Sequence, residues 1–396
     1  MSPTAPLPQP RPNRLAELRA RRSAVGARRA YHCRCGRPIF FRNSLCLGCQ
    51  TPLGYEPQLA EVVPLEPAEP AGLWRVVGEH AASAPAGLYR RCGNFESPAG
   101  CNWLLPADGP GAEPAQTLCI ACRLNRTIPD LSVPENGPLW ASIELAKRRL
   151  VSSLLALGLP VRSRLSEDPD RGLAFDFLKA LPGAPVTTGH AAGIITLNLD
   201  EADDAKRERM RLQMHEPYRT LLGHLRHEVG HYYWDRLVAG TPWHEPFRSL
   251  FGDEREDYQA ALDRHYRQGA AGDWPLRHVS AYASMHPWED WAETWAHYLH
   301  MVDTLDTSLS LGLTSDLLEI EWEPFGPEAL YRSEEPGAVE FLSFVNGWIE
   351  LTGVLNELTR SMGERDFYPF VLSAVAVRKL HFVHLVVAQA PQRAAR

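Results

Sequence analysis

One stretch of the sequence has the residue types and spacing to activate a water molecule on a metal ion. His227, Glu228 and His231 form an H-E-x-x-H pattern within HLRHEVGHYYWDRLV, residues 224–238. On a helix, positions i and i+4 lie on the same face, so both imidazoles can reach one Zn²⁺. Glu228 stands beside them and can take a proton from a water on the metal. A chance match in a histidine-rich helix is the alternative.

A catalytic zinc usually has three protein ligands and a water, so a third ligand is needed. Residues 280–305, SAYASMHPWEDWAETWAHYLHMVDTL, predict a helix that starts at Pro287. Glu289 and Glu293 lie one turn apart on this helix. We expect Glu289 to bind the metal and Glu293 to accept the free N–H of a ligating histidine, which fixes its tautomer. Asp290 points elsewhere, and a solvated acidic face is the alternative for the pair.

Peptide hydrolysis also needs a hydrogen-bond donor for the oxyanion that develops on the carbonyl. Tyr282 stands seven residues before Glu289 and is the best candidate, although a packed tyrosine is an equally simple interpretation. The pattern as a whole predicts a zinc-dependent endopeptidase in which Glu228 is the general base. A peptide or protein would be the substrate.

All eight cysteines lie between residues 33 and 122, in CxC and CxxC spacings typical of zinc thiolates. The first predicted structural zinc site is Cys33, Cys35, Cys46 and Cys49. The second is Cys92, Cys101, Cys119 and Cys122. The looser spacing of the second set leaves open that Cys92 or Cys101 is a plain buried thiol. We therefore expect about three zinc ions, one catalytic and two structural.

The bulk composition fits a globular protein of two or three domains. The chain has 396 residues, a net charge of −7 and 44% hydrophobic residues. The N-terminus has no apolar signal region, and the nearest candidate for a membrane span, residues 370–387, is interrupted by basic residues. We expect a cytoplasmic protein without membrane contact. The acidic balance does not favour nucleic acid as a partner, and the oligomeric state is open.

Secondary-structure patterns place these residues on predicted elements. Residues 1–30 form a basic, proline-rich tail, interpreted as disordered, with a weak contact to an anionic partner as the alternative. Residues 123–137 are interpreted as a linker. The further predicted elements, in chain order, are a helix at 139–157, a strand at 173–178, a turn and strand at 189–199, a helix opening at Glu216-Pro217, and helices at 255–266, 339–361 and 369–387. The strand before the H-E-x-x-H helix is expected at a sheet edge beside the cleft.

Other titratable residues have simpler interpretations. His190 is expected in a surface turn. The acidic cluster at 253–257 fits a solvated helix start, and a lining of the substrate cleft is the alternative. His381 and His384 could bind a metal, but core or surface histidines are the favoured interpretation.

The sequence resembles a bacterial family of zinc-binding metallopeptidases with an N-terminal zinc-ribbon domain. The segments that carry the resemblance are YHCRCGRPIFFRNSLCLGCQTPLGYEP, HEVGHYYW and HPWEDWAETWAHYLHMVDTL. The catalytic part is also similar to the gluzincins, and to the lethal factor of anthrax in the offsets of Tyr282, Glu289 and Glu293. The resemblance implies a zinc peptidase without an assigned substrate, with these three residues as oxyanion partner, zinc ligand and outer carboxylate.

The expected fold class is α+β. A zinc-ribbon-type β module with two four-cysteine sites, residues 31–130, precedes a mainly helical, gluzincin-like metallopeptidase domain with a small sheet, residues 131–390. A competing hypothesis is a zinc-ribbon protein that binds protein or nucleic acid and carries a non-catalytic peptidase-like domain. An intermediate version is a protease recruited by its ribbons, as in DNA–protein crosslink proteases, although those use a histidine as third ligand.

Overall fold

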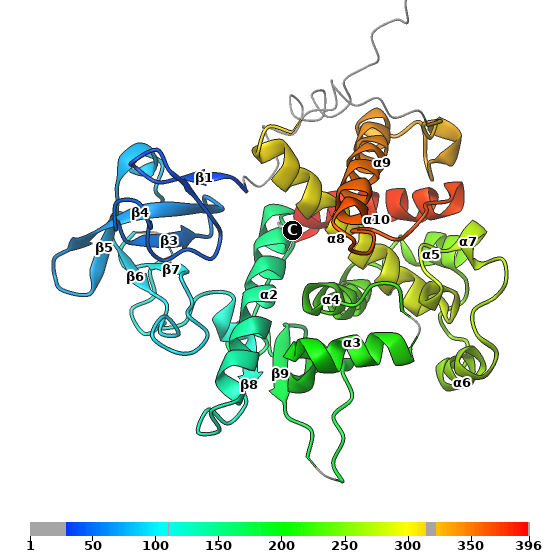
Figure 1. Ribbon diagram of the computed structural model, residues 1–396, viewed down its shortest axis with the longest axis horizontal. Helices are drawn as coiled ribbons and strands as arrows, with labels where there is room; N and C mark the ends of the chain where they lie inside the picture. The colour runs from blue at the N-terminus through cyan, green and yellow to red at the C-terminus, as the bar shows by residue number, and fades with distance from the viewer. Residues whose placement is uncertain (1–28, 110, 182, 215, 314–321, 395–396) are drawn as a thin grey trace, which may run out of the picture.

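The computed structural model describes residues 29–313, apart from 110, 182 and 215, and residues 322–394. The tail predicted for residues 1–30 therefore lies, as far as residue 28, outside the described part. A strand-rich N-terminal region stands beside a mainly helical region, and one long helix lies between them (Figure 1). The fold is α+β, and this prediction is confirmed.

The N-terminal region consists of two small antiparallel sheets. β1 (Tyr31–His32) pairs with β2 (Pro38–Ile39) across the first cysteine knuckle. The second sheet has five strands in chain order: β3 (Leu53–Glu56), β4 (Glu61–Ala68), β5 (Leu73–Val76), β6 (Tyr89–Arg91) and β7 (Leu104–Pro106). The rings of Phe41, Tyr55 and Trp103 pack together in its core, with Tyr55 and Trp103 centroids 4.6 Å apart.

The C-terminal region is built from helices around a central antiparallel pair. Its helices are α2 (Asn136–Ala156), α3 (Asp204–Gln213), α4 (Leu221–Leu237), α5 (His244–Phe251), α6 (Tyr258–Gln268), α7 (Trp274–Arg277), α8 (Pro287–Ser310), α9 (Ala338–Ser361) and α10 (Ala374–Ala394). α4 and α8 form the most extensive helix pair and bring two distant segments of sequence together.

A glycine sets how closely α4 and α8 approach each other. A Cβ atom at Gly230 would lie 3.1 Å from the Cα of Ala292, so any larger residue would push the helices apart. The indole N–H of Trp291 donates to the Gly230 carbonyl over 2.9 Å and ties the helices at the same level. Because Gly230 directly precedes His231, this contact fixes the position of the histidine pair along the length of α8.

A four-stranded sheet lies beside α4. Its order is β10 (Gly189–Ala191), β11 (Ile194–Asn198), β9 (Ala174–Leu178) and β8 (Asn125–Thr127). β9 runs parallel to both β11 and β8, and β10 forms a hairpin with β11. The strand expected at the sheet edge, β11, therefore lies between β10 and β9, so that prediction was wrong and β10 forms the edge. β8 lies within residues 123–137, so the linker prediction was wrong for this part. The strand is three residues long and polar, and its sequence has no alternation that would reveal it.

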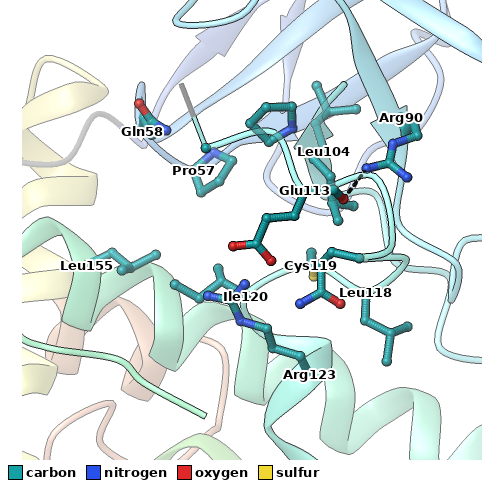
Figure 2. A pocket seen from close by; sticks show the side chains of 14 residues that line it. Pro57, Gln58, Arg90, Leu104, Glu113, Leu118, Cys119, Ile120, Arg123 and Leu155 are labelled. Carbon is teal, nitrogen blue, oxygen red and sulfur yellow. Dashed lines mark hydrogen bonds between the residues drawn. The ribbon is translucent and has the colours of Figure 1, made fainter. Parts of the chain in front are cut away.

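The largest hydrophobic core cluster runs through both regions, from Tyr31 to Ala390, and two smaller clusters are separate from it. α2 provides the junction, because one side of it meets the cysteine-rich loops and the other meets α4. A pocket of about 220 Å³ lies at this junction, between the end of β7 and the C-terminal part of α2 (Figure 2). Leu104, Ile120 and Leu155 supply apolar walls, and Arg90 and Arg123 lie at its sides.

Two further predictions are corrected by the helix positions. α4 begins at Leu221 and not at Pro217, because the Thr220 side chain accepts the Gly223 N–H over 3.0 Å and caps the helix there. Among the described residues, one helix has the length and apolar composition of a membrane span, and it is α9, whereas the nearest candidate by sequence was the interrupted segment 370–387, which was not expected to span. Half of the apolar window of α9 is buried inside the fold, and core helices pass the same test. The two predicted C-terminal helices are confirmed as α9 and α10.

Candidate metal centre

α4 and α8 bring His227, His231 and Glu289 together, as the spacing predicted. Their ligand atoms all lie within 4.8 Å of one another, and all three residues are buried. His227 Nε2 is 2.9 Å from Glu289 Oε2, and His231 Nε2 is 3.5 Å from Glu289 Oε1. The first two side chains come from one face of α4. Glu289 lies in the first turn of α8, where the His286 cap and Pro287 start the helix.

Glu293 makes the contact expected for an outer carboxylate. His227 Nδ1 donates to Glu293 Oε1 over 2.8 Å, and Ser280 Oγ donates to Glu293 Oε2 over 2.6 Å. Burial alone would raise the pKa of Glu293, but the His227 hydrogen bond and charge lower it to about 2. The carboxylate is therefore ionised at neutral pH and keeps the proton of His227 on Nδ1.

The atoms that face one another across the cluster fit a cation. Burial alone would lower the pKa of His227, but Glu289 and Glu293 raise it. Because Nδ1 donates to Glu293, the proton that a cation would replace is the one on Nε2, which faces a carboxylate oxygen. That oxygen, Glu289 Oε2, is buried and lies 2.9 Å from His227 Nε2, without a hydrogen bond to any other described residue. Two imidazole nitrogens and one carboxylate oxygen form a donor set that zinc prefers. The residues therefore fit a zinc ion held by His227, His231 and Glu289.

Glu228 lies beside this cluster, and one of its carboxylate oxygens is in contact with His224. His224 Nε2 is 3.2 Å from Glu228 Oε1, one turn earlier on α4. Burial alone would raise the pKa of Glu228, but the hydrogen bond from His224 and the charge of His227 bring it below its usual value. Glu228 is thus an ionised carboxylate in a buried position, as a proton acceptor must be.

Two tyrosines approach the cluster, and the sequence predicted one of them. The Tyr282 ring is 6.0 Å from the His227 ring, and burial together with the Glu289 charge raises the pKa of its hydroxyl. Tyr258, at the start of α6, donates its hydroxyl to Glu289 Oε1 over 2.9 Å. Burial and the same carboxylate raise the pKa of Tyr258. Both phenols are therefore protonated donors at neutral pH.

His190 does not lie in a surface turn, so that prediction was wrong. It is half-buried in β10, and its ring lies 6.4 Å from the His231 ring and 6.3 Å from the Trp288 ring. Its Nε2 accepts the Gly193 N–H over 3.0 Å. Burial, with a smaller effect of His231, lowers the pKa of His190 to about 4.

The eight cysteines gather into the two predicted groups, and all are free thiols. Cys33 and Cys49 sulfurs are 3.5 Å apart, and Cys101 and Cys119 sulfurs are 3.6 Å apart. A disulfide would need about 2.05 Å. Four sulfurs at about 2.3 Å from a tetrahedral zinc lie roughly 3.8 Å from one another, so both groups fit a zinc ion.

The remaining candidates take structural roles. Asp290 points away from the cluster and pairs with Lys379. In the acidic cluster, Glu254 pairs with Arg248 at 2.6 Å and Asp257 caps α6. His381 is buried against the Phe341 ring, with a centroid distance of 4.7 Å, as expected for a core histidine.

Fold and site together define a zinc-binding protein with a ribbon-type N-terminal region. A family model described as "putative zinc-binding metallo-peptidase" matches residues 136–386, and a zinc-ribbon domain model matches residues 30–133. The chain belongs to this zinc-binding metallopeptidase family. It is 42% identical over 361 residues to uncharacterised proteins of Mycobacterium bovis and Mycobacterium tuberculosis, which covers 91% of this chain and 95% of each relative. No solved structure matches the chain.

Sequence reasoning missed Tyr258, and the significance of His190 and His224. His224 had a usable signal, because it stands four residues before Glu228 on the same helix. No sequence pattern pointed to Tyr258 or His190, since each reaches the site from an element whose position depends on tertiary packing.

Proposed function

We propose that this protein is a zinc-dependent peptidase that hydrolyses peptide bonds in a peptide or protein substrate. One observation carries the proposal: His227, His231 and a buried carboxylate oxygen of Glu289 converge beside Glu228, an ionised carboxylate in contact with His224. Their residue types and order match the gluzincin arrangement, with a glutamate as third ligand.

Each residue has a defined task in the proposed reaction. Zinc, when bound, polarises the peptide carbonyl and lowers the pKa of a water molecule towards 7. Glu228 takes the proton from this water and returns it to the leaving amine. Glu293 holds the proton of His227 on Nδ1 and so leaves Nε2 free for the metal.

The two phenols are placed to serve the developing oxyanion. Tyr282 was the predicted donor, and Tyr258 lies on the same side, in contact with Glu289. A protonated phenol can donate to the carbonyl oxygen as it gains negative charge, and such donors are often worth about 10²–10³ in kcat. We assign this task to Tyr282 and a supporting role to Tyr258.

The sheet beside α4 supplies a docking edge for an extended substrate. Within the described residues, β10 pairs with β11 on one side only, and it packs against α4. Backbone groups on its other side can pair with a substrate strand and align it along the metal cluster. Such pairing is independent of side chains, so it fits a peptide substrate.

Replacement of the base tests the proposal. Glu228→Gln should abolish turnover of a casein digest or peptide library while the zinc content stays at the wild-type value. Glu289→Ala should remove one of about three zinc ions and also abolish activity. Full turnover by Glu228→Gln would refute the mechanism, and an unchanged zinc count in Glu289→Ala would place the third ligand elsewhere.

A second candidate function is supported by the surface of the first ribbon, the segment around Cys33, Cys35, Cys46 and Cys49. Arg34, Arg37 and Arg42 are exposed there together with Phe40 and Leu47, and no acidic residue occurs between positions 18 and 55. Such a surface could bind an acidic protein segment or nucleic acid and recruit a substrate. A gel-shift assay at low salt, comparing the wild type with an Arg37→Ala/Arg42→Ala variant, separates these partners.

A further inference from the structure

A chain of three side chains, of which Glu201 and Glu228 are buried and His224 is half-buried, leads from the small sheet to the proposed base. His224 lies between two carboxylates: its Nδ1 is 2.6 Å from Glu201 Oε2, and its Nε2 is 3.2 Å from Glu228 Oε1. Glu201 belongs to the short turn that follows β11, and His224 and Glu228 lie one helical turn apart on α4. The metal ligands, the base and the tyrosines account for the proposed reaction without Glu201 or His224.

Two contacts define the form of the His224 ring: a hydrogen bond to Glu201 and an ion pair with Glu228. Ionised carboxylates only accept hydrogen bonds, so a ring that bonds to one at each nitrogen must donate from both. His224 is then an imidazolium that carries one positive charge between two negative ones. The pKa shifts agree with this. Burial would lower the pKa of His224, but Glu201 and Glu228 raise it to about 9, and His224 in turn lowers the pKa of Glu201 to about 2.

Glu201 is itself held firmly. It is 2% exposed, its Oε1 accepts the Thr188 hydroxyl, and its Oε2 lies 3.4 Å from Arg219 Nη2. A partner fixed on three sides can hold the His224 ring in one orientation. A histidine that is hydrogen-bonded only to water would sample several rotamers, and the group in contact with it would then be held less precisely.

We propose that His224, fixed by Glu201, is a positioning residue for Glu228. Its Nε2–H holds Oε1 of the base and leaves Oε2 as the oxygen that accepts the proton. Glu201 balances the imidazolium charge, so that His224 orients Glu228 without removing its capacity to bind a proton. This inference rests on the proposed function, in which Glu228 is the base.

Four variants of the full-length, zinc-loaded protein test the proposal through kcat, KM and zinc content. His224→Leu removes the donor to Glu228 and should lower kcat by roughly 10–100-fold, the usual effect of losing such a partner, with KM and zinc content unchanged. His224→Gln keeps an amide N–H donor and should recover part of this loss. Glu201→Gln should lower kcat by a smaller factor, because the ring loses its charged anchor.

His244→Leu is the matched control. His244 also pairs with a half-buried glutamate, at 2.9 Å from Glu254, and its exposure is similar to that of His224, but it does not touch Glu228. Its kcat should equal that of the wild type. If His224→Leu retains the kcat of His244→Leu, or if His224→Gln is no better than His224→Leu, the positioning role is wrong.

An independent measurement separates this inference from the proposed function. With ¹⁵N-labelled histidine, the His224 ring, assigned through the His224→Gln spectrum, should show protons on both nitrogens at neutral pH. A ring with one unprotonated nitrogen would overturn the inference even in an active enzyme. A doubly protonated ring in a protein that cleaves no peptide would instead refute the peptidase proposal and leave the Glu201–His224–Glu228 geometry standing.

Discussion

The two cysteine clusters have the same four ligands but very different surroundings. In the first, Cys33 and Cys46 are buried while Cys35 and Cys49 are exposed, and the cluster closes a short knuckle at the edge of the molecule. In the second, all four cysteines are buried. The first cluster is therefore a local staple of which only Cys33 and Cys46 reach the shared core, whereas all four cysteines of the second lie inside it.

Contacts from α2 explain why the second cluster is buried. Cys122 Sγ lies 3.9 Å from Glu144, and Glu144 pairs with Lys147 at 2.7 Å, with both side chains fully buried. Arg148 donates to the Ala99 carbonyl over 3.0 Å. A zinc ion with four thiolates carries net negative charge, and Lys147 and Arg148 on α2 offset this charge together with the charge of Glu144. Because α2 also packs on α4, the second cluster is linked to the helix that carries His227.

Removal of one ligand from each cluster should give the largest contrast. Cys119→Ser should prevent stable folding of the helical region as well as the ribbon, because binding of structural zinc is worth about 10–16 kcal/mol in small zinc domains. Cys35→Ser should loosen only the first knuckle. Thermal melting followed by far-UV circular dichroism checks both variants. Equal melting temperatures for the two variants would show that the two clusters contribute equally to the stability of the helical region.

Substitution in the buried pair on α2 tests the junction without replacing a zinc ligand. Glu144→Gln leaves Lys147 buried without its carboxylate, which should lower the free energy of unfolding by about 3–5 kcal/mol. Glu66→Gln, which breaks the exposed pair with Arg75, should cost no more than about 1 kcal/mol. Urea denaturation measures both changes. A Glu144→Gln variant as stable as Glu66→Gln would show that α2 does not depend on this contact.

The two clusters should also differ in how fast they release zinc, because their cysteines differ in exposure. A mercurial thiol reagent should release the first zinc at least about tenfold faster than the second, a difference of roughly 1.4 kcal/mol in barrier height. The reason is that Cys35 and Cys49 are exposed while the second set is not. A chromogenic zinc indicator records the phases, and Cys35→Ser should remove the fast one. A single phase would contradict the difference in access.

Two adjacent phenylalanines should mark where the core of the first ribbon ends. Phe40 is 60% exposed and Phe41 is buried against Tyr55. Phe40→Ala should change the free energy of unfolding by no more than about 0.5 kcal/mol. Phe41→Ala should cost about 3–5 kcal/mol, because it empties a packed aromatic site. Equal effects, measured by denaturation, would mean that Phe40 packs in solution.

The parts of the site that could be predicted from sequence depend on helical spacing. His227 with His231, and Glu289 with Glu293, are pairs at i and i+4, and such pairs share a face wherever the helix lies. The parts that could not be predicted depend on how elements meet. Tyr258 reaches Glu289 only because α6 crosses near the start of α8, and the polar strand β8 forms only because β9 offers an unpaired edge.

The sequence by itself determined which atoms are available to bind metal: eight thiolates in two sets, two imidazoles and a carboxylate. It determined the helices that carry them, since periodicity and capping are local. Only the tertiary structure decided that Glu289 meets the two histidines, through the close α4–α8 contact at Gly230. It also decided that the second cysteine cluster is part of the core, because burial results from long-range packing that no local pattern encodes.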